Sequence, residues 1–182
     1  MKSDTIAAIA TALSDAGIGI IRISGPEAIA VANRVVVNKK KEHTLKNWQT
    51  HTIHYGFVEE NGTILDEVMV SVMKAPRSYT TEDTVEINCH GGVLLTKRVL
   101  EAVLHAGARM AEPGEFTKRA FLSGRIDLSE AEAVMDLIDS KNEMARKNSM
   151  TQLKGGLSGR IKQLREEIIY QVAFIESALD DP

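Results

Sequence analysis

Residues 52–73 read TIHYGFVEENGTILDEVMVSVM, and this stretch decides the fold of the first part of the chain. Two segments, Thr52–Val58 and Ile64–Met73, flank five residues that contain Asn61-Gly62. Asn-Gly between alternating segments is the strongest short-range signal for a β-hairpin, because both residues tolerate positive φ. The stretch therefore predicts two antiparallel strands, the second of which alternates valines with methionine and serine.

Upstream of this hairpin, two short apolar runs have the length of strands, Thr5–Thr11 and Ile18–Ser24. Gly25-Pro26 follows and opens a predicted helix over Glu27–Val36, since a proline in the first helical turn loses no hydrogen bond. The loop Lys39–Glu42 carries three lysines, and we interpret it as solvated rather than as a phosphate site.

Downstream of the hairpin, Thr84–His90 predicts a further strand, and a helix follows Gly91-Gly92. Another short helix is expected over Glu115–Leu122, with Lys118 and Arg119 mostly outward. The first two thirds of the chain therefore read as mixed α/β.

The last third of the chain is helical in pattern. Ser129–Glu132 and Ser140–Glu143 match capping boxes, so they predict a short helix and then a longer one. Gly155-Gly156 predicts a break in the longer helix. Apolar residues then recur at spacings of three and four, at Leu157, Ile161, Leu164, Ile168, Val172, Ile175 and Leu179. Such a seam packs against other helices, supplied by Leu128–Leu153, by another subunit or by further chain.

Composition sets the broad class of protein. The chain has 182 residues, 43% of them hydrophobic and 26% charged, which is typical of a globular protein. We place a domain boundary near residue 120, giving residues 1–120 and 121–182. The net charge of −3 and the 4% aromatic content argue against a broad nucleic-acid-binding surface. One cysteine and the lack of an apolar run of ~18–20 residues favour a cytoplasmic protein outside the membrane.

Arg22 is the first candidate for chemistry. Its strand, Ile18–Ile23, is apolar on both faces, so we expect it to be buried on both. A guanidinium there needs an anionic partner or a wet cavity. Two interpretations stay open, namely a structural ion pair or wet strand end, and a ligand cleft lined by Arg22.

The strand that follows the hairpin offers further candidates. Its alternation puts Glu86, Asn88 and His90 on one face and Cys89 on the other. Glu86 either lines a site or simply pairs with Arg22. Asn88 and His90 lack further ligands at metal-site spacing, so we expect no metal, and Cys89 is interpreted as packed rather than nucleophilic.

Common nucleotide and hydrolase motifs are missing from the sequence. Gly155–Arg160 is rich in glycine but does not match the phosphate-binding pattern GxxxxGK[ST]. Neither GxSxG nor HExxH occurs, so we name no catalytic residue. Arg125, just past Gly124, lies in a predicted turn from which its side chain could reach a cleft.

Three groups of segments, in order along nearly the whole chain, resemble the tRNA-modification GTPases of the MnmE (TrmE) type. They are Asp4–Thr11 with Gly17–Gly25, then Ala75–Thr80 with Glu82-Asp83 and Cys89–Gly92, and finally Glu112–Leu122 with Leu128, Ala131–Ala133 and Asp136–Ile138.

The resemblance implies an α/β fold of the α+β kind, with a mostly antiparallel sheet and flanking helices, followed by an all-α segment. It implies that residues 1–120 bind 5-formyl- or 5,10-methylene-tetrahydrofolate and form a homodimer. Residues 121–182 would be the first part of a helical domain that is interrupted by a GTPase domain. The family's folate contacts correspond to Arg22, Glu86 and Arg125.

The resemblance also implies a reaction for the whole protein. With a flavin- and NADH-dependent partner, MnmG (GidA), such proteins add a carboxymethylaminomethyl group to C5 of the tRNA wobble uridine and hydrolyse GTP with Mg²⁺ and K⁺. The GTP and metal sites are expected to be absent from this chain, which alone should hydrolyse no GTP. Two alternatives remain, a stand-alone folate-dependent one-carbon transferase and a purely structural dimerisation module.

Overall fold

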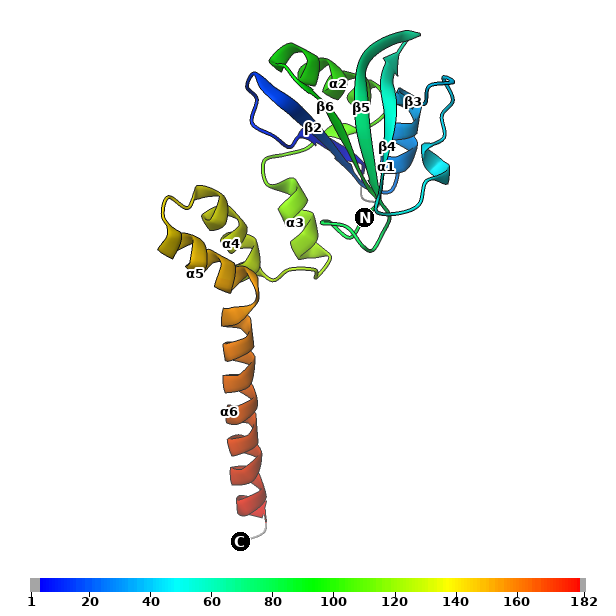
Figure 1. Ribbon diagram of the computed structural model, residues 1–182. Coiled ribbons are helices and arrows are strands. Elements are labelled where there is room, and N and C mark those ends of the chain that lie inside the picture. Colours follow the sequence, from blue (N-terminus) through cyan, green and yellow to red (C-terminus); the bar gives the residue numbers. More distant parts are fainter. Residues whose placement is uncertain (1–3, 181–182) are drawn as a thin grey trace. The chain divides into compact units, whose positions relative to one another are not determined.

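The computed structural model describes residues 4–180, apart from the side chains of Leu157 and Asp180. The chain divides into two units, Met1–Ser123 and Gly124–Pro182, and each is described by itself (Figure 1). The first unit mixes strands and helices, whereas the second is all-helical.

The first unit is built on one sheet, which has seven strands in the described residues. Their order across the sheet is β3-β4-β5-β6-β2-β1-β7. The strands are β1 (Ile6–Ile9), β2 (Ala16–Ser24), β3 (Val36–Val37), β4 (Thr52–Glu60), β5 (Thr63–Met73), β6 (Thr84–Gly91) and β7 (Arg109–Met110). Neighbours are antiparallel except β1 and β7, which run parallel. The prediction of a mostly antiparallel sheet is confirmed.

The predicted hairpin forms between β4 and β5. Asn61 and Gly62 connect the strands with φ of 51° and 81°, the left-handed region that a two-residue hairpin turn of this type requires. Val68, Val70 and Val72 are buried on one face of β5. The turn thus fixes the register, and the register places the valines in the core.

Two helices cover one face of the sheet, α1 (Ala28–Val35) and α2 (Val93–His105) (Figure 1). The core between them and the sheet consists mainly of β-branched side chains. Its members include Ile21, Ile23, Val31, Val35, Val70, Val72, Val85, Ile87, Val99 and Val103. A single turn of 3₁₀-helix, η1 (Leu45–Asn47), adds the fully buried Leu45.

The opposite face of the sheet, which we call the open face, carries half-exposed apolar side chains. Ile18 is 61% exposed, and Ile53 and Met69 are also exposed. The prediction that the strand around Arg22 is buried on both faces is therefore wrong. Ile21 and Ile23 point to the helices and are fully buried, whereas Ile18 is exposed on the open face.

Two edge strands were not predicted from the sequence. The predicted helix ran to Val36, but α1 ends at Val35, and Val36 and Val37 form β3, which pairs with β4. Arg109 and Met110 form β7, which pairs in parallel with β1. Strands of two residues are too short for alternation to reveal them.

The second unit contains α4 (Leu128–Asp139), α5 (Glu143–Leu153) and α6 (Gly156–Asp180). The predicted capping residues are wrong for both shorter helices. Asp127 caps α4 and forms a capping box with Glu130, because the helix begins earlier than expected, and Asn142 caps α5. The predicted break is confirmed, since Gly155 lies between α5 and α6 with φ of 75°.

The apolar seam of α6 is exposed to solvent. Its described members are between 48% and 74% exposed, namely Ile161, Leu164, Ile168, Val172, Ile175 and Leu179, while the side chain of Leu157 lies outside the described part. The helices α4 and α5 therefore do not supply the expected cover. No helix in the described part of the chain is long and apolar enough to cross a membrane.

Candidate functional site

Arg22 and Glu86 face each other across β2 and β6. They are register partners on the open face, and Arg22 Nε donates to Glu86 Oε1 at 2.7 Å. Their side chains are 31% and 21% exposed. The ion pair that the sequence left open is present, and it is reachable from solvent.

The pair has polar atoms to spare. Among residues 4–180, Arg22 Nε and Glu86 Oε1 are the only side-chain atoms of the two that enter a protein hydrogen bond. Both terminal nitrogens of Arg22 and Glu86 Oε2 thus remain available to water or a ligand.

Two aromatic rings lie beside the guanidinium. The central carbon of Arg22 is 5.9 Å from the ring centre of Tyr79 and 5.6 Å from that of Phe116. Tyr79 belongs to the loop between β5 and β6, and Phe116 belongs to α3 (Glu115–Leu122). The Tyr79 and Thr117 hydroxyl groups are hydrogen-bonded at 3.0 Å, which joins the loop to the helix.

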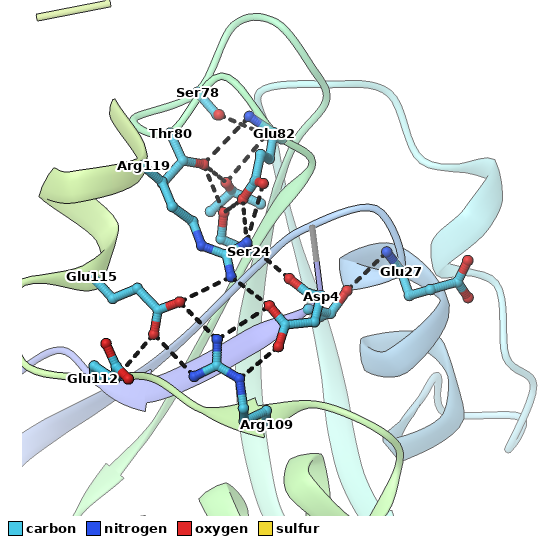
Figure 2. A network of polar contacts seen from close by, with 12 residues as sticks. Asp4, Ser24, Glu27, Ser78, Thr80, Glu82, Arg109, Glu112, Glu115 and Arg119 are labelled. Atoms are coloured by element: carbon cyan, nitrogen blue, oxygen red, sulfur yellow. Dashed lines mark hydrogen bonds and ion pairs between the residues drawn. The ribbon is translucent and has the colours of Figure 1, made fainter. Parts of the chain in front are cut away.

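A second charged network, which sequence reasoning missed, lies in the same unit (Figure 2). We call it the clasp and define it as Asp4, Glu82, Arg109, Glu115 and Arg119. Arg119 Nη2 donates to Asp4 Oδ1 at 2.9 Å and to Glu115 Oε1 at 3.0 Å. Its Nη1 lies 3.1 Å from both Glu82 carboxylate oxygens.

The prediction that Arg119 points mostly outward is wrong. Its side chain is only 12% exposed, because carboxylates from three separate segments surround the guanidinium. The one local signal was the spacing of four between Glu115 and Arg119, which allows a helical ion pair. The other two partners, Asp4 and Glu82, are distant in sequence.

Arg109 completes the clasp from the edge strand β7. It donates to Asp4 through Nε at 2.6 Å and to Glu115 through Nη2 at 2.7 Å. These bonds hold the pKa of Asp4 and of Glu115 at about 2, with the Arg109 hydrogen bond as the main cause in each case. The pKa of Arg119 is raised, since its carboxylate partners outweigh the effect of burial.

The clasp also reaches the strand that carries Arg22. Ser24, the last residue of β2, donates from Oγ to Glu82 Oε2 at 2.9 Å and is bonded to the Thr80 hydroxyl at 2.6 Å. Ser78 Oγ donates to the Glu82 carbonyl at 2.6 Å. The loop is therefore bonded to β2 through Thr80 and Glu82, and Ser78 adds a bond within the loop (Figure 2).

The remaining polar groups of β6 fit a structural role. Cys89 is buried, its thiol donates to the Gly19 carbonyl at 3.3 Å, and burial raises the thiol's pKa, which confirms the packed interpretation. The Asp66 carboxylate accepts hydrogen bonds from the backbone N–H of His90 and from its ring Nδ1. The bond to the ring raises the pKa of His90. The described residues contain no cluster of three or more potential metal ligands.

A separate cavity of about 680 Å³ is lined in part by two residues of the clasp. Asp4 and Glu82 contribute to its lining, together with Thr5, Pro26, Glu27, Ala75, Asp83 and Gly107. Neither Arg22 nor Glu86 lines it, so this cavity is not the predicted folate cleft.

Arg125, the third predicted site residue, belongs to the second unit of the chain. It follows Gly124, whose φ is 75°, and its side chain is exposed. The structure thus brings Arg22 and Glu86 together, and the assignment of Arg125 to the same ligand stays a prediction.

Two family models match the chain one after the other. Residues 5–125 match the model described as the GTP-binding protein TrmE N-terminus, and residues 128–182 match the MnmE helical domain. Curated relatives named tRNA modification GTPase MnmE are also similar. The protein from Lachnoclostridium phytofermentans is 61% identical over all 182 residues, and the one from Listeria welshimeri is 53% identical over the same length.

The chain spans about two fifths of these relatives, 40% of the first and 39% of the second. The relative from Bacillus subtilis is 51% identical over 181 residues, which cover 98% of this chain and 39% of that protein. These matches confirm the resemblance drawn from the three groups of segments. The chain belongs to the family of the tRNA modification GTPase MnmE.

Proposed function

We propose that the first unit binds a one-carbon tetrahydrofolate, 5-formyl- or 5,10-methylene-tetrahydrofolate, at Arg22 and Glu86. The observation that carries this proposal is the half-exposed ion pair with unused hydrogen-bonding atoms beside two aromatic rings. Flat, polar heterocycles suit such surroundings, because rings stack on side-chain rings while their edges need hydrogen-bond partners.

The chemistry of the pair fits the two ends of a folate. A pterin edge presents a ring N–H and an exocyclic amine side by side, and the Glu86 carboxylate can accept from both. The glutamate tail of folate is anionic and suits a guanidinium fork. Arg22 has its terminal nitrogens available for this contact, and Arg125 is the second candidate from the family resemblance.

Homodimerisation through the first unit is part of the same proposal. The open face exposes Ile53 and Tyr55 on β4, Met69 on the neighbouring β5, and Ile18 on β2. A second copy of the unit would remove these side chains from water. Light scattering on the chain should then give twice the mass of the monomer.

For a protein of the relatives' length we propose tRNA modification and GTP hydrolysis, as in the name of these relatives, and we further propose the site and the partner that the family resemblance implies. It would modify C5 of the tRNA wobble uridine together with the MnmG (GidA) flavoprotein, in the cytoplasm, and the folate would supply the methylene carbon. GTP, Mg²⁺ and K⁺ would act in a GTPase domain outside the present chain. We expect the chain alone to hydrolyse no GTP above a protein-free control.

Calorimetric titration of the chain with 5-formyltetrahydrofolate tests the folate site. We expect saturable binding by the wild type and a loss of about 1.5–3 kcal/mol in Glu86→Ala, because a charge-assisted hydrogen bond is removed. Glu101→Ala is the matched control, since this exposed carboxylate on α2 pairs only with a surface arginine in the described residues.

Three results would count against the proposal. No heat at ligand concentrations near a millimolar would reject folate binding and leave the structural dimerisation module. Unchanged affinity in Glu86→Ala would show that this carboxylate serves only its ion pair. An equal loss in Glu101→Ala would attribute the effect to net charge.

A further inference from the structure

Three elements beside the proposed folate site are joined through the clasp, namely β2, the Tyr79 loop and α3. Arg22 lies on β2, whose last residue Ser24 donates to Glu82 at 2.9 Å. Tyr79 and Glu82 lie on the same loop, between β5 and β6. Since Glu82 is bonded to Arg119, the strand and the loop are anchored to one guanidinium.

Helix α3 connects the clasp with the aromatic rings. Glu115 and Arg119 are one helical turn apart and face the clasp, where they bond to each other at 3.0 Å. Phe116 and Thr117 lie between them in sequence and contact Arg22 and Tyr79 instead. One short helix thus presents a ring to the site and its anchoring charges to the clasp.

The two arginines of the clasp differ in the carboxylates to which they are bonded. Arg109 bonds to Asp4 and Glu115, and its bonds join β7 to the chain start and to α3. Arg119 bonds to the same two carboxylates and in addition to Glu82, so it alone of the two reaches the Tyr79 loop. Arg119 is also the less exposed, 12% against 42%.

We propose that Arg119 is a positioning residue for the folate site: its bonds to Glu82 and Glu115 fix the distance between the Tyr79 loop and α3. This role rests on the folate site proposed above. The guanidinium fork holds both carboxylates in a set geometry, which a point charge such as lysine does not reproduce. If the link is loosened, Tyr79 and Phe116 lose their common position beside Arg22, although Arg22 and Glu86 stay paired on the sheet.

The test combines affinity with local dynamics in the chain of residues 1–182. The variants are Arg119→Lys and Glu82→Gln, which break the link from either end, and Arg109→Lys as the matched control from the same clasp. Affinity for 5-formyltetrahydrofolate is measured by calorimetry, and amide hydrogen exchange is followed in residues 75–83 and 115–122, with strand β5 as the internal reference.

We expect Arg119→Lys and Glu82→Gln to bind the folate at least about tenfold more weakly, because small misplacements of contacting groups are costly. Exchange should accelerate in residues 75–83 and 115–122 while β5 keeps its wild-type protection. Arg109→Lys should change the affinity by less than about threefold, even where it lowers the stability of the fold as much.

The outcomes separate the two proposals. If the wild type binds and Arg119→Lys binds equally well, the positioning role is overturned and the folate site stands. If Arg109→Lys weakens binding as much as Arg119→Lys, the effect belongs to the stability of the clasp and the role is overturned as well. If the wild type does not bind, the proposed folate site is rejected. If hydrogen exchange in residues 75–83 is the same in Arg119→Lys as in the wild type, the positioning role of Arg119 is rejected.

Discussion

The two units of the chain differ in how far their large apolar side chains are buried. In the first unit, valines and isoleucines of the sheet and of α1 and α2 form one buried core. In the second, the described buried residues are small, Ala133 and Ser149, and the large apolar side chains of α6 are exposed. A periodic apolar pattern thus predicts which face of a helix is apolar, but it does not predict which other element packs on that face.

This difference in the burial of apolar side chains indicates which unit contributes most to the stability of the chain. The first unit buries its apolar face between a sheet and two helices, which is a complete two-layer arrangement. Among the described residues no second layer covers the seam of α6, and the chain spans 40% of the relative from Lachnoclostridium phytofermentans. We therefore expect the two units to respond very differently to matched substitutions, and the predictions below test this contrast.

The largest contrast is expected from truncating one isoleucine in each unit. Ile87 is fully buried at the centre of the sheet, whereas Ile168 in α6 is 57% exposed. Ile87→Ala should lower the free energy of unfolding by about 2–5 kcal/mol, because it leaves a cavity. Ile168→Ala should change it by less than about 0.5 kcal/mol.

Denaturant unfolding measures this contrast, followed by tryptophan fluorescence for the first unit and by far-ultraviolet circular dichroism for the all-helical second unit. Trp48 is the single tryptophan of the chain and stacks on His54 in the first unit, so its signal reports that unit. A loss above about 1 kcal/mol in Ile168→Ala would show that the α6 seam is covered in solution, for example by self-association.

The next contrast concerns ion pairs. The pKa of Glu115 is about 2, against an ordinary 4.5, so the folded state resists protonation more than the unfolded state does. Its contribution is fully present above pH 4.5 and is lost as the pH falls toward 2. Glu115→Gln should cost on the order of 2 kcal/mol at neutral pH, and this cost should shrink steadily as the solution is acidified.

Glu143→Gln in the second unit is the control for this experiment. Glu143 pairs with Arg146 on the same helix, and both side chains are about half exposed or more. Such surface pairs contribute little, so the expected change is below about 0.5 kcal/mol. Unfolding curves at a series of pH values measure the free energy of unfolding of both variants. If the loss in Glu115→Gln does not depend on pH, it does not come from the lowered pKa of Glu115.

The smallest effect is expected at the start of α4. Asp127 accepts the Glu130 backbone amide at 2.8 Å, so Asp127→Ala should destabilise the helix by about 1 kcal/mol. Ser129, the cap predicted from sequence, donates to Asp127 instead, and Ser129→Ala should matter less. Thermal melts followed by circular dichroism compare the two variants, and a larger loss in Ser129→Ala would reverse the assignment.

Local signals account for what the sequence predicted correctly. The hairpin follows from Asn61-Gly62, and the bounds of α3 follow from Gly114 before it and Ser123-Gly124 after it. The polar face of β6 follows from strict alternation, which also placed Cys89 in the core. The capping error at α4 arose because Asp127–Glu130 and Ser129–Glu132 fit the same pattern.

Only some residues of the site could be predicted, because some stand out within their own strand whereas others depend on partners that are distant in the sequence. Arg22 stood out as a charge within an apolar strand, and Glu86 stood out on a polar face. Arg119 did not, since its helix alone offers only Glu115, and its other partners lie 37 and 115 residues away. Burial of a charge by distant carboxylates becomes visible only when the fold brings them together.

The burial of Cys89 gives the protein a built-in chemical reporter. It is the single cysteine of the chain, it packs in β6, and burial raises the pKa of its thiol. A thiol reagent should react with the native chain only as fast as the sheet opens, so the labelling rate measures that opening without any substitution. A cysteine introduced on the exposed side of α6 would then take a dye selectively, which lets the second unit be followed independently of the first.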